Sequence, residues 1–486
     1  MGARSTARRA AGFLTLISQF ILIVMEEYDV LVIGSGSGMS IANAAINRGM
    51  KVAVVESGPL GGTCLNRGCI PSKNVIYPAD VINIIKEAGK LGIKAKIEEI
   101  DFGYIMERSR SYIGEDVGHM EEAVKHVDNL TMYRDVGEFI SDYTMKVGEE
   151  TFSGENVFIV SGARPFIPPI KGIEETGYIT NQTVWDLTER PESLVIVGGG
   201  FVAVEFAHFF SSVGTEVTVL SRSPRLVKQG EPEISELLEK TMKRSMNVYT
   251  DVEAIKAHVE GGKKVVRARN RGTELVDDFE AEEIMLAAGR RSNADLLKPE
   301  MTGVEVDGRG YIVVNEYLET SKPRIWAFGD AIGKHMFKHV ANYETEIAWN
   351  NFIGEQKAAV DYSAVPYAVF SNPQIASVGM TEEAAREKGY DILLGHYEYR
   401  NTAKGMAMGV EEGFVKVVVE DKSLKILGGH IIGPYAPIMM QEIINAMNTE
   451  DGTVASIQRS MYIHPATPEV VQRAFFGLHK HEEHHH

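Results

Sequence analysis

The sequence predicts an α/β protein with two Rossmann-like dinucleotide-binding domains, and three observations lead to this fold class. The chain has 486 residues, enough for about three domains of ordinary size. Its composition, 44% hydrophobic and 24% charged residues, is typical of a globular protein able to bury several cores. A strand, a glycine-rich turn, a helix and a second strand follow one another twice, at residues 28–56 and 194–222.

The first of these units places its glycines where a dinucleotide pyrophosphate binds. An apolar strand at 30–33 leads into Gly34 and Gly36 and then into a helix expected at 40–48. Gly34 permits the tight turn, and Gly36 lets the backbone approach a pyrophosphate at the helix N-terminus. The next strand ends in Glu56, at the position where an acid accepts hydrogen bonds from an adenosine ribose.

One position departs from the dinucleotide-binding fingerprint. Met39 stands where the third glycine or alanine of the pattern is expected. Because that small residue lets the helix and the strand pack closely, we expect looser packing at this point. The strand before the turn, the helix after it and the terminal acid still favour a dinucleotide site.

The second unit follows the fingerprint more closely. A strand at 194–197 runs into Gly198 and Gly200, and Ala203 fills the third small position. A helix through residue 210 and a strand at 216–220 complete the unit. A second dinucleotide site is therefore expected here.

The strand that closes the second unit lacks the acid that contacts an NAD ribose. Ser221 and Arg222 occupy this position, and Arg225 follows. With no carboxylate to repel it, a ribose 2′-phosphate can pair with Arg222 and Arg225, which favours NADPH over NADH. The alternative is that both arginines are ordinary solvated surface residues.

The chain contains two cysteines, Cys64 and Cys69, with four residues between them. Thiols this close can form a small reducible disulfide, whereas a structural bridge stabilises a protein by closing a longer loop. A buried pair of inert thiols and half of a metal site are the alternatives. A tetrahedral zinc site needs further Cys or His ligands at short spacing, and none lies nearby. We therefore favour redox catalysis and expect no metal site.

Two dinucleotide sites and a reducible cysteine pair form a chemically coherent set. A flavin passes electrons between a nicotinamide and a disulfide. Cys64 and Cys69 follow the first unit closely, so we expect them near the dinucleotide that this unit binds.

Charge and hydropathy restrict the partners and the location. The formal net charge of −17 argues against nonspecific binding to nucleic acid or to anionic membrane, because both need a basic surface. Beyond residue 24, no stretch approaches the roughly 20 apolar residues that span a bilayer. We expect a cytoplasmic protein that associates with neither nucleic acid nor membrane.

The two terminal segments differ from the rest of the chain. Residues 1–26 look like an extension, in which Arg4, Arg8 and Arg9 precede the apolar run 10–24. We favour an over-extended reading frame with Met25 as the start, over a targeting segment or a short membrane anchor. The His-rich tail at 479–486 is expected to be a disordered tail or tag remnant.

Further motifs resemble those of the FAD-dependent pyridine nucleotide–disulfide oxidoreductases. The resemblance covers about residues 27–478, nearly the whole chain. The motifs that carry it are the cysteine segment 61–73, Val160-Ser161-Gly162-Ala163-Arg164-Pro165, Ala287-Ala288-Gly289-Arg290, Thr320 through Ala327-Phe328-Gly329-Asp330, and His464-Pro465 with Glu469.

The resemblance implies a catalytic role for each matched residue. Cys69 would face the flavin as the charge-transfer thiolate, and Cys64 would be the interchange thiol that attacks a substrate disulfide. His464, oriented by Glu469, would be the acid–base partner, contributed across a homodimer interface. These roles agree with the chemistry, because an imidazolium lowers the pKa of a nearby thiol and a carboxylate fixes a histidine tautomer.

The resemblance also implies contacts to the cofactors FAD and NADP, with NAD as the alternative nucleotide. Asp330 would hydrogen-bond the ribityl chain of FAD, and Lys73, paired with Glu205, would lie near the flavin ring. His339 falls in a segment near the flavin, and we expect it to pack there rather than to act in catalysis. The remaining cofactor-binding positions are Thr63, Gly137, Gly162, Gly289 and Gly329.

The implied organisation has three units. An FAD-binding domain is split into 27–165 and 296–362, and an NAD(P)-binding domain is inserted at 166–295. A C-terminal α+β dimerisation domain at 363–478 would form the dimer interface and deliver the histidine. In this last unit we expect strands at 415–419 and 426–432 and helices at 380–389 and 437–448.

Several positions indicate a branch of the family. Tyr462 stands where glutathione reductase and lipoamide dehydrogenase usually carry another histidine, and this pattern looks more like mycothione reductase. The segments 292–297 and 338–342 point the same way. Arg67 replaces a small apolar residue between the cysteines; it either lowers a thiolate pKa or points to solvent. The absence of a third cysteine disfavours mercuric reductase and the large thioredoxin reductases.

We therefore expect a homodimeric flavoenzyme that reduces a low-molecular-mass disulfide with NADPH. The alternative within the family is an NAD-dependent dihydrolipoamide dehydrogenase, the E3-type component of 2-oxoacid dehydrogenase complexes. A flavoprotein that binds or assembles without turnover is the alternative from another class, and the Cys64, Cys69, His464 and Glu469 set argues against it.

Overall fold

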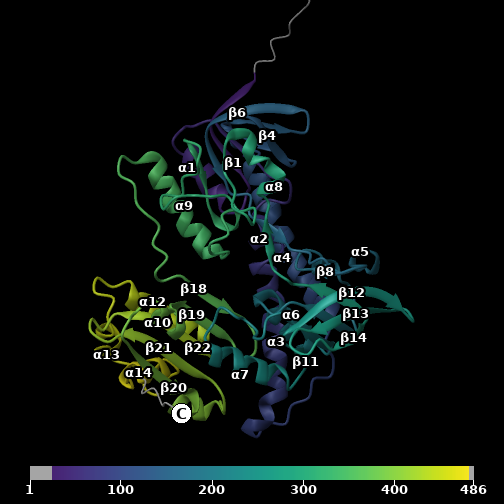
Figure 1. Cartoon of the computed structure of the whole chain (residues 1–486), viewed down its shortest axis with the longest axis vertical. Coiled ribbons are helices and arrows are strands. Elements are labelled where there is room, and N and C mark those ends of the chain that lie inside the picture. Colours follow the sequence, from purple (N-terminus) through teal and green to yellow (C-terminus); the bar gives the residue numbers. More distant parts are fainter. Residues whose placement is uncertain (1–24, 481–486) are drawn as a thin grey trace, which may run out of the picture.

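The first sheet combines segments that lie far apart in the sequence. The computed structural model describes residues 25–480 (Figure 1). β1 (Glu26–Ile33) lies between β2 (Val52–Val55) and β6 (Glu150–Ile159), in the strand order β3-β2-β1-β6-β5-β4. β17 (Ile325–Ala327) pairs with β6 in parallel, so the chain returns to this sheet after a long excursion. The other strands are β3 (Leu130–Tyr133), β4 (Gly137–Ser141) and β5 (Thr144–Val147).

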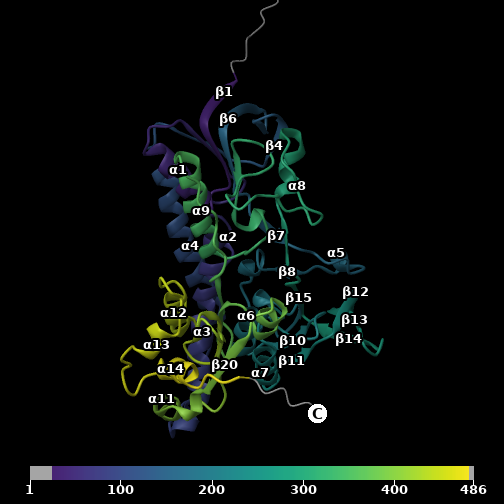
Figure 2. The ribbon, with the colours of Figure 1, turned by 60° about the vertical axis from the view of Figure 1, so that its left-hand side comes forward.

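Helices pack beside this sheet, and two long ones extend away from it (Figure 2). The longest, α4 (Phe102–Val124), begins after Asp101, whose carboxylate accepts a hydrogen bond of 2.8 Å from the Tyr104 N–H. Such an N-cap satisfies a backbone donor that has no partner within the helix. The other helices of this unit are α1 (Gly38–Ile46), α2 (Gly62–Asn66), α3 (Cys69–Glu87), α8 (Ala294–Leu297) and α9 (Lys338–Ile353).

The second sheet is parallel and has the order β11-β10-β9-β15-β8. Its strands are β8 (Ile179–Thr180), β9 (Ser193–Val197), β10 (Glu216–Leu220), β11 (Asn247–Tyr249) and β15 (Glu283–Leu286). α6 (Phe201–Ser212) follows β9 and is apolar on nearly every side, as expected of a helix enclosed by other elements. α5 (Ile173–Thr176) and α7 (Pro232–Met242) complete the helices of this unit.

Two smaller sheets accompany the second unit. The antiparallel strands β12 (Val252–Glu260), β13 (Lys263–Asn270) and β14 (Val276–Ala281) project to one side (Figure 1). β7 (Ala163–Pro165) pairs with β16 (Arg290–Ser292) where the chain enters and leaves the unit.

The C-terminal sheet is antiparallel, with the order β18-β19-β22-β21-β20. Its strands are β18 (Pro366–Val369), β19 (Ile375–Gly379), β20 (Ile392–Glu398), β21 (Phe414–Glu420) and β22 (Ile426–Ile432). The accompanying helices are α10 (Glu382–Glu387), α11 (Ala403–Ala407), α12 (Ala436–Met447), α13 (Ala455–Gln458) and α14 (Glu469–Phe476).

The α/β fold class and its elements agree with the predictions. Both strand–turn–helix–strand units are present, and the expected C-terminal strands and helices form with small shifts at their ends. Within residues 25–480, no helix is long and apolar enough to cross a membrane. Residues 1–24 of the predicted extension and 481–486 of the predicted tail lie outside the described residues.

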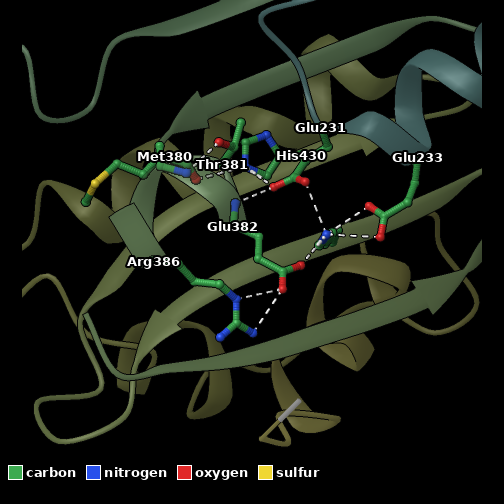
Figure 3. Close-up of polar contacts among 9 residues, drawn as sticks. Glu231, Glu233, Met380, Thr381, Glu382, Arg386 and His430 are labelled. Atoms are coloured by element: carbon green, nitrogen blue, oxygen red, sulfur yellow. Dashed lines mark hydrogen bonds and ion pairs between the residues drawn. The ribbon is translucent and has the colours of Figure 1, made fainter. Parts of the chain in front are cut away.

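A buried charge cluster joins the second unit to the C-terminal sheet (Figure 3). Lys416 of β21 is 6% exposed, and its Nζ lies 2.8 Å from carboxylate oxygens of both Glu233 and Glu382 and 3.1 Å from Glu231 Oε2. Glu231, 1% exposed, also accepts a hydrogen bond of 2.7 Å from the Glu382 N–H. Burial lowers the pKa of Lys416, but the surrounding carboxylates outweigh it and the pKa is raised. The ammonium therefore stays charged and holds the two units together.

A fully buried histidine completes this cluster. His430 Nε2 lies 3.0 Å from the Met380 carbonyl oxygen and 3.6 Å from Glu231 Oε1. Burial lowers the pKa of His430, so the neutral ring donates from Nε2 to the carbonyl. The positive charge that faces Glu231 is therefore that of Lys416.

Replacing Lys416 with Met should destabilise the docking of these units. The change leaves the buried carboxylate of Glu231 without its lysine, whereas Glu382 keeps Arg386 and Glu233 is half exposed. Breaking a buried pair in this way costs about 3–5 kcal/mol. Calorimetry should show a lower melting temperature than for the parent protein. Lys422→Met is the matched control, because the Lys422 pair with Asp391 is exposed and 3.8 Å long, so its loss should change stability by less than about 1 kcal/mol. Equal melting temperatures for both variants would contradict this account of the cluster.

Candidate active site

A cavity of about 1630 Å³ connects the two glycine turns. It runs from the first turn, past the cysteine helices, to the second turn and the strand that ends at Leu220. Most of the residues singled out from the sequence line it: Gly34, Gly36, Glu56, Thr63, Cys64, Cys69, Lys73, Gly137, Gly162, Gly198, Gly200, Glu205, Arg222, Arg225, Gly289, Gly329 and Asp330. Ala203, His464 and Glu469 do not.

The first glycine turn passes very close to the end of β6. Gly34 has φ +108°, and a Cβ on it would lie 2.3 Å from the Val160 carbonyl oxygen. Only glycine tolerates both the positive φ and this approach. A Cβ on Gly36, by contrast, would have only the Gly62 backbone near it, at 3.9 Å, and Gly36 borders the cavity.

The looser packing expected at Met39 is not what the structure shows. The helix begins one residue earlier than this position, at Gly38, and a Cβ on Gly38 would lie 2.7 Å from the Val32 side chain. Gly38 therefore provides the close approach of helix and strand, while Met39 is buried. The prediction was wrong because the small residue stands one place earlier in the turn.

The second glycine turn repeats the first. A Cβ on Gly198, which has φ +147°, would lie 2.2 Å from the Ala287 carbonyl oxygen. A Cβ on Gly200 would have no atom within 4 Å, so this residue leaves the backbone open to the cavity. Ala203 is fully buried within α6, as expected for the third small position.

Glu56 is tied to the first turn. Its Oε2 accepts hydrogen bonds from the Ser35 N–H at 2.9 Å and the Ser35 hydroxyl at 2.7 Å. Its Oε1 accepts one from the Gly58 N–H at 2.8 Å. These contacts fix the carboxylate at the end of β2, beside the cavity.

The two cysteines lie on adjoining helices. Cys64 belongs to α2 and Cys69 begins α3, and both are free thiols. A hydrogen bond from Cys64, helped by the charge of Lys73, lowers the pKa of Cys69 to about 6. The same hydrogen bond and burial raise the pKa of Cys64. At neutral pH the thiolate of the pair is therefore Cys69.

A glutamate from the second unit holds the cation beside Cys69. Lys73 Nζ donates to both carboxylate oxygens of Glu205, at 2.8 and 3.0 Å. Glu205 also accepts a hydrogen bond of 3.0 Å from the Phe370 N–H. The pair expected from the sequence is present, and it lies where three units meet.

A second lysine on the cavity wall was not among the predicted site residues. Lys338 begins α9 and donates from Nζ to the Ser37 hydroxyl at 2.8 Å, and Ser37 in turn donates to Asn342 Oδ1 at 3.1 Å. Its charge acts to lower the pKa of Cys64. The segment 338–342 had indicated only a family branch, so nothing in the sequence alone placed this ammonium near the cysteines.

The structure favours one of the two alternatives for Arg67 and agrees with the packing role expected for His339. Arg67 is exposed, and the cations that lower the thiol pKa values are Lys73 and Lys338, which favours the solvent-facing alternative for Arg67. His339 Nε2 lies 2.8 Å from the Pro366 carbonyl oxygen, and its ring stacks on Phe337 at 5.4 Å. These contacts agree with a packing role for His339.

Asp330 lies on the cavity wall beside an arginine. Arg290 Nε is 3.2 Å from Asp330 Oδ2. Burial raises the pKa of Asp330, and the arginine opposes that shift. Gly162, Gly289 and Gly329, all with positive φ, also border the cavity without side chains to fill it.

His464 and Glu469 form a pair that does not line this cavity. His464 Nδ1 lies 2.9 Å from Glu469 Oε1, and the Ala466 N–H donates to Glu469 Oε2 at 3.0 Å. The hydrogen bond with His464 lowers the pKa of Glu469. The His464 side chain is 72% exposed, so its free Nε2 faces outward from this chain.

Comparison with known proteins agrees with this geometry. Residues 28–345 match the family described as pyridine nucleotide-disulphide oxidoreductase, and residues 365–475 match its dimerisation domain. The chain is 37% identical over 473 residues to mycothione reductase from Mycobacterium tuberculosis (strain CDC 1551 / Oshkosh), with 93% of this chain and 100% of that protein covered. A dihydrolipoyl dehydrogenase from Geobacillus stearothermophilus is 32% identical over 461 residues, covering 92% of this chain and 95% of that protein.

Two further relatives extend the comparison. A mercuric reductase from Staphylococcus aureus is 34% identical over 417 residues, covering 84% of this chain and 75% of that protein. The HOCl-induced flavoprotein disulfide reductase RclA from Escherichia coli has a similar structure, with a TM-score of 0.82, 26% identity, and coverage of 92% of this chain and 99% of that one. The chain belongs to the pyridine nucleotide–disulphide oxidoreductases, enzymes that depend on FAD and use a pyridine nucleotide.

Proposed function

We propose that this enzyme reduces a low-molecular-mass disulfide with NADPH, through a redox-active Cys64–Cys69 pair. The observation that carries the proposal is that both cysteines line the cavity into which both glycine turns open. Electrons that start from a nicotinamide at the second turn must reach the cysteines, which lie beside the first turn. A continuous cavity between the two turns allows this transfer.

The residues around the first turn suit FAD. Gly36 leaves the backbone free to approach a pyrophosphate, and Glu56 stands at the end of β2 for the ribose. Asp330 would offer a carboxylate to the ribityl chain, and Lys73, whose cation acts on Cys69, would lie near the flavin ring. These residues would hold FAD, whose chemistry would link a two-electron donor, the nicotinamide, to a two-electron acceptor, the disulfide. Thr63, Gly137, Gly162, Gly289 and Gly329 would border it.

The residues around the second turn suit NADPH. Gly198 and Gly200 would cradle the pyrophosphate at the start of α6. Arg222 and Arg225 line the same cavity, and within residues 25–480 no carboxylate pairs with either guanidinium. Both are therefore free to bind a 2′-phosphate.

The pKa values support separate roles for the two thiols. Cys64 would give its proton to His464 and attack one sulfur of the substrate disulfide to form a mixed disulfide, while the other sulfur leaves as a thiol by taking that proton back from His464. The Cys69 thiolate would then attack the sulfur of Cys64, which re-forms the Cys64–Cys69 disulfide and releases the second product thiol. Two electrons from NADPH restore the dithiol for the next turnover.

The proposal places His464 and Glu469 in the active site of a second copy of the chain. The match to a dimerisation domain at 365–475 supports a homodimer. The exposed Nε2 of His464, outside the cavity of its own chain, is what such an arrangement needs. Glu469 would hold the ring through Nδ1, so that Nε2 exchanges protons with the leaving thiol.

The domain boundaries that we propose are 27–165 with 296–362 for FAD, 166–295 for NAD(P) and 363–478 for dimerisation. The pairing of β17 with β6 supports the split of the first domain. The pairing of β7 with β16 supports the borders of the second. We propose a cytoplasmic location for the enzyme.

A dihydrolipoamide dehydrogenase acting with NAD is the second candidate. The relative named dihydrolipoyl dehydrogenase at 32% identity supports it. Ser221 and Arg222 at the end of β10 argue against it, because a carboxylate for the NAD ribose is absent there. Mercuric reduction is not favoured, because the sequence has no further cysteine pair.

Replacing Cys64 with Ser should separate the two halves of the reaction. We expect NADPH still to reduce the flavin, because that step does not need Cys64. Turnover of a disulfide substrate, chosen from a panel of low-molecular-mass disulfides, should fall by at least about a thousandfold because the nucleophile is gone. Disulfide turnover that survives in this variant would contradict the mechanism, and absence of turnover in the parent enzyme with every disulfide would contradict the function.

Replacing Lys73 with Met should raise the pKa of Cys69. The long-wavelength absorbance that a thiolate produces beside the flavin should appear in the reduced enzyme as the pH rises through about 6. Without the cation, the midpoint should move upward by about one unit, because an opposite charge favours the thiolate. Lys86→Met is the control on the same helix, since the Lys86 ammonium contacts the Ser212 carbonyl oxygen instead. An unchanged midpoint in Lys73→Met would exclude this role.

Replacing both Arg222 and Arg225 with Ala should change nucleotide preference. We expect kcat/KM for NADPH to fall about ten- to hundredfold, because hydrogen bonds to charged groups are lost, while kcat/KM for NADH stays within about threefold. Arg271→Ala is the control, because Arg271 lies nearby but bonds to the Arg222 carbonyl oxygen and Asp251. An enzyme that prefers NADH before any substitution would overturn the choice of NADPH.

A further inference from the structure

The loop that carries His464 has few contacts with the rest of its chain. It connects α13 to α14, and its residues 459–461 and 463–465 are exposed. Met461 and Ile463, on either side of Tyr462, are among the most exposed apolar side chains of the described part of the chain. A loop with so little packing needs specific anchors if it is to present a side chain accurately.

Tyr462 is the one side chain in this stretch that turns inward. Its ring packs against the hydrophobic core of the C-terminal unit, and its hydroxyl donates to Glu442 Oε2 at 2.7 Å. Glu442 comes from α12, twenty residues earlier in the chain. This contact attaches the loop to a helix that also packs against the C-terminal sheet.

Burial of the Glu442 carboxylate has a desolvation cost. Glu442 Oε1 is buried and has no hydrogen-bond partner within residues 25–480. Burial raises the pKa of Glu442 to about 7, against the opposing hydrogen bond from Tyr462. An apolar pair would fill the same space without this desolvation. Packing of the core alone therefore does not account for a polar pair at this position.

Two anchors of different origin bracket His464. Glu469, at the start of α14, bonds to His464 Nδ1 and fixes the tautomer and tilt of the ring. Tyr462 fixes the backbone two residues before the histidine. Glu469 therefore orients the imidazole ring, and Tyr462 determines the position of the backbone that carries it.

We propose that Glu442 and Tyr462 are positioning residues, which hold the loop so that His464 meets the Cys64 site of a second copy of the chain. This inference rests on the proposed function. Neither residue would touch the substrate. Each would act through His464, for which a displacement of about 1 Å can cost about a hundredfold in rate.

The test uses the full-length holoenzyme and compares its two half-reactions by rapid mixing. In Tyr462→Phe, which removes only the hydroxyl, we expect reduction by NADPH to stay within about twofold and reoxidation by the disulfide to slow about ten- to hundredfold. Glu442→Gln keeps an acceptor oxygen and should retain reoxidation within about threefold, whereas Glu442→Ala should resemble Tyr462→Phe.

Tyr397→Phe is the matched control. Tyr397 belongs to the same C-terminal unit and packs against the same core, but its hydroxyl donates to the Asn401 carbonyl oxygen at 3.2 Å. Both half-reactions should be unchanged in this variant. Thermal melting of each variant identifies any general loss of folding.

Coupling to His464 distinguishes positioning from a structural role. In a His464→Ala background, Tyr462→Phe should slow reoxidation by less than about twofold further, because the group it positions is absent. The rate at which iodoacetamide alkylates Cys64 in the reduced enzyme should follow the same pH profile in Tyr462→Phe and His464→Ala, and a different one in the parent.

Three results would overturn the inference: unimpaired reoxidation in Tyr462→Phe, an effect of equal size in the His464→Ala background, or an alkylation profile like that of the parent. Failure of the proposed function is separate, because it would show as a parent enzyme that no disulfide reoxidises. The alkylation profiles then still report whether Tyr462 controls the position of His464.

Discussion

One carboxylate, that of Glu205, connects all three units of the molecule close to the two cysteines. It stands five residues after Gly200 on α6, which fixes it relative to the second glycine turn. It receives two hydrogen bonds from Lys73, four residues after Cys69, and one from the backbone of Phe370 in the C-terminal sheet region. The Glu205 side chain is 10% exposed, whereas that of Lys73 is 36% exposed where it borders the cavity. The contacts between Glu205 and Lys73 thus help to fix the distance between the second glycine turn and the cysteine pair.

The charges of this acidic protein are distributed unevenly. Lys73 and Lys338 lie near the cysteines and act to lower the pKa values of Cys69 and Cys64, respectively. Lys73 is paired with the carboxylate of Glu205, whereas Lys338 bonds to the Ser37 hydroxyl. Around Lys416 the ratio is reversed, with several carboxylates sharing one ammonium in a structural junction. The same two residue types therefore serve reactivity in one place and cohesion in the other, according to which of them is in excess.

The sequence predicted well whatever depends on neighbours along the chain. Both glycine turns and the strands that flank them follow from local patterns, and seventeen of the twenty selected site residues line the cavity. The helices that carry the two cysteines were not predicted. The exception at Met39 shows the limit of a fixed spacing, because Gly38 supplies the small residue one place earlier. A pattern of letters cannot reveal which of two adjacent residues meets the strand.

Contacts between distant segments were beyond prediction. The partners of Lys416 come from the start of α7 and from α10, and no motif joins these segments to β21. The hydrogen bond between Tyr462 and Glu442 is similar: the sequence marks the tyrosine as unusual but gives no indication of the helix that receives it. Lys338 was visible only as part of a family pattern, and its proximity to Cys64 arises from the packing of α9 against the first turn.

The contact of Gly34 with the Val160 carbonyl oxygen has a counterpart in that of Gly198 with the Ala287 carbonyl oxygen. The two halves differ at the third fingerprint position. In each half, however, a glycine without a side chain lies close to the carbonyl oxygen of the residue that follows a neighbouring strand. If the halves descend from a common ancestor by duplication, both have kept this atomic contact while the residues around it differ. The residues that select the nucleotide can then differ between the halves. The glycine at each close contact cannot be replaced without moving the backbone that it touches.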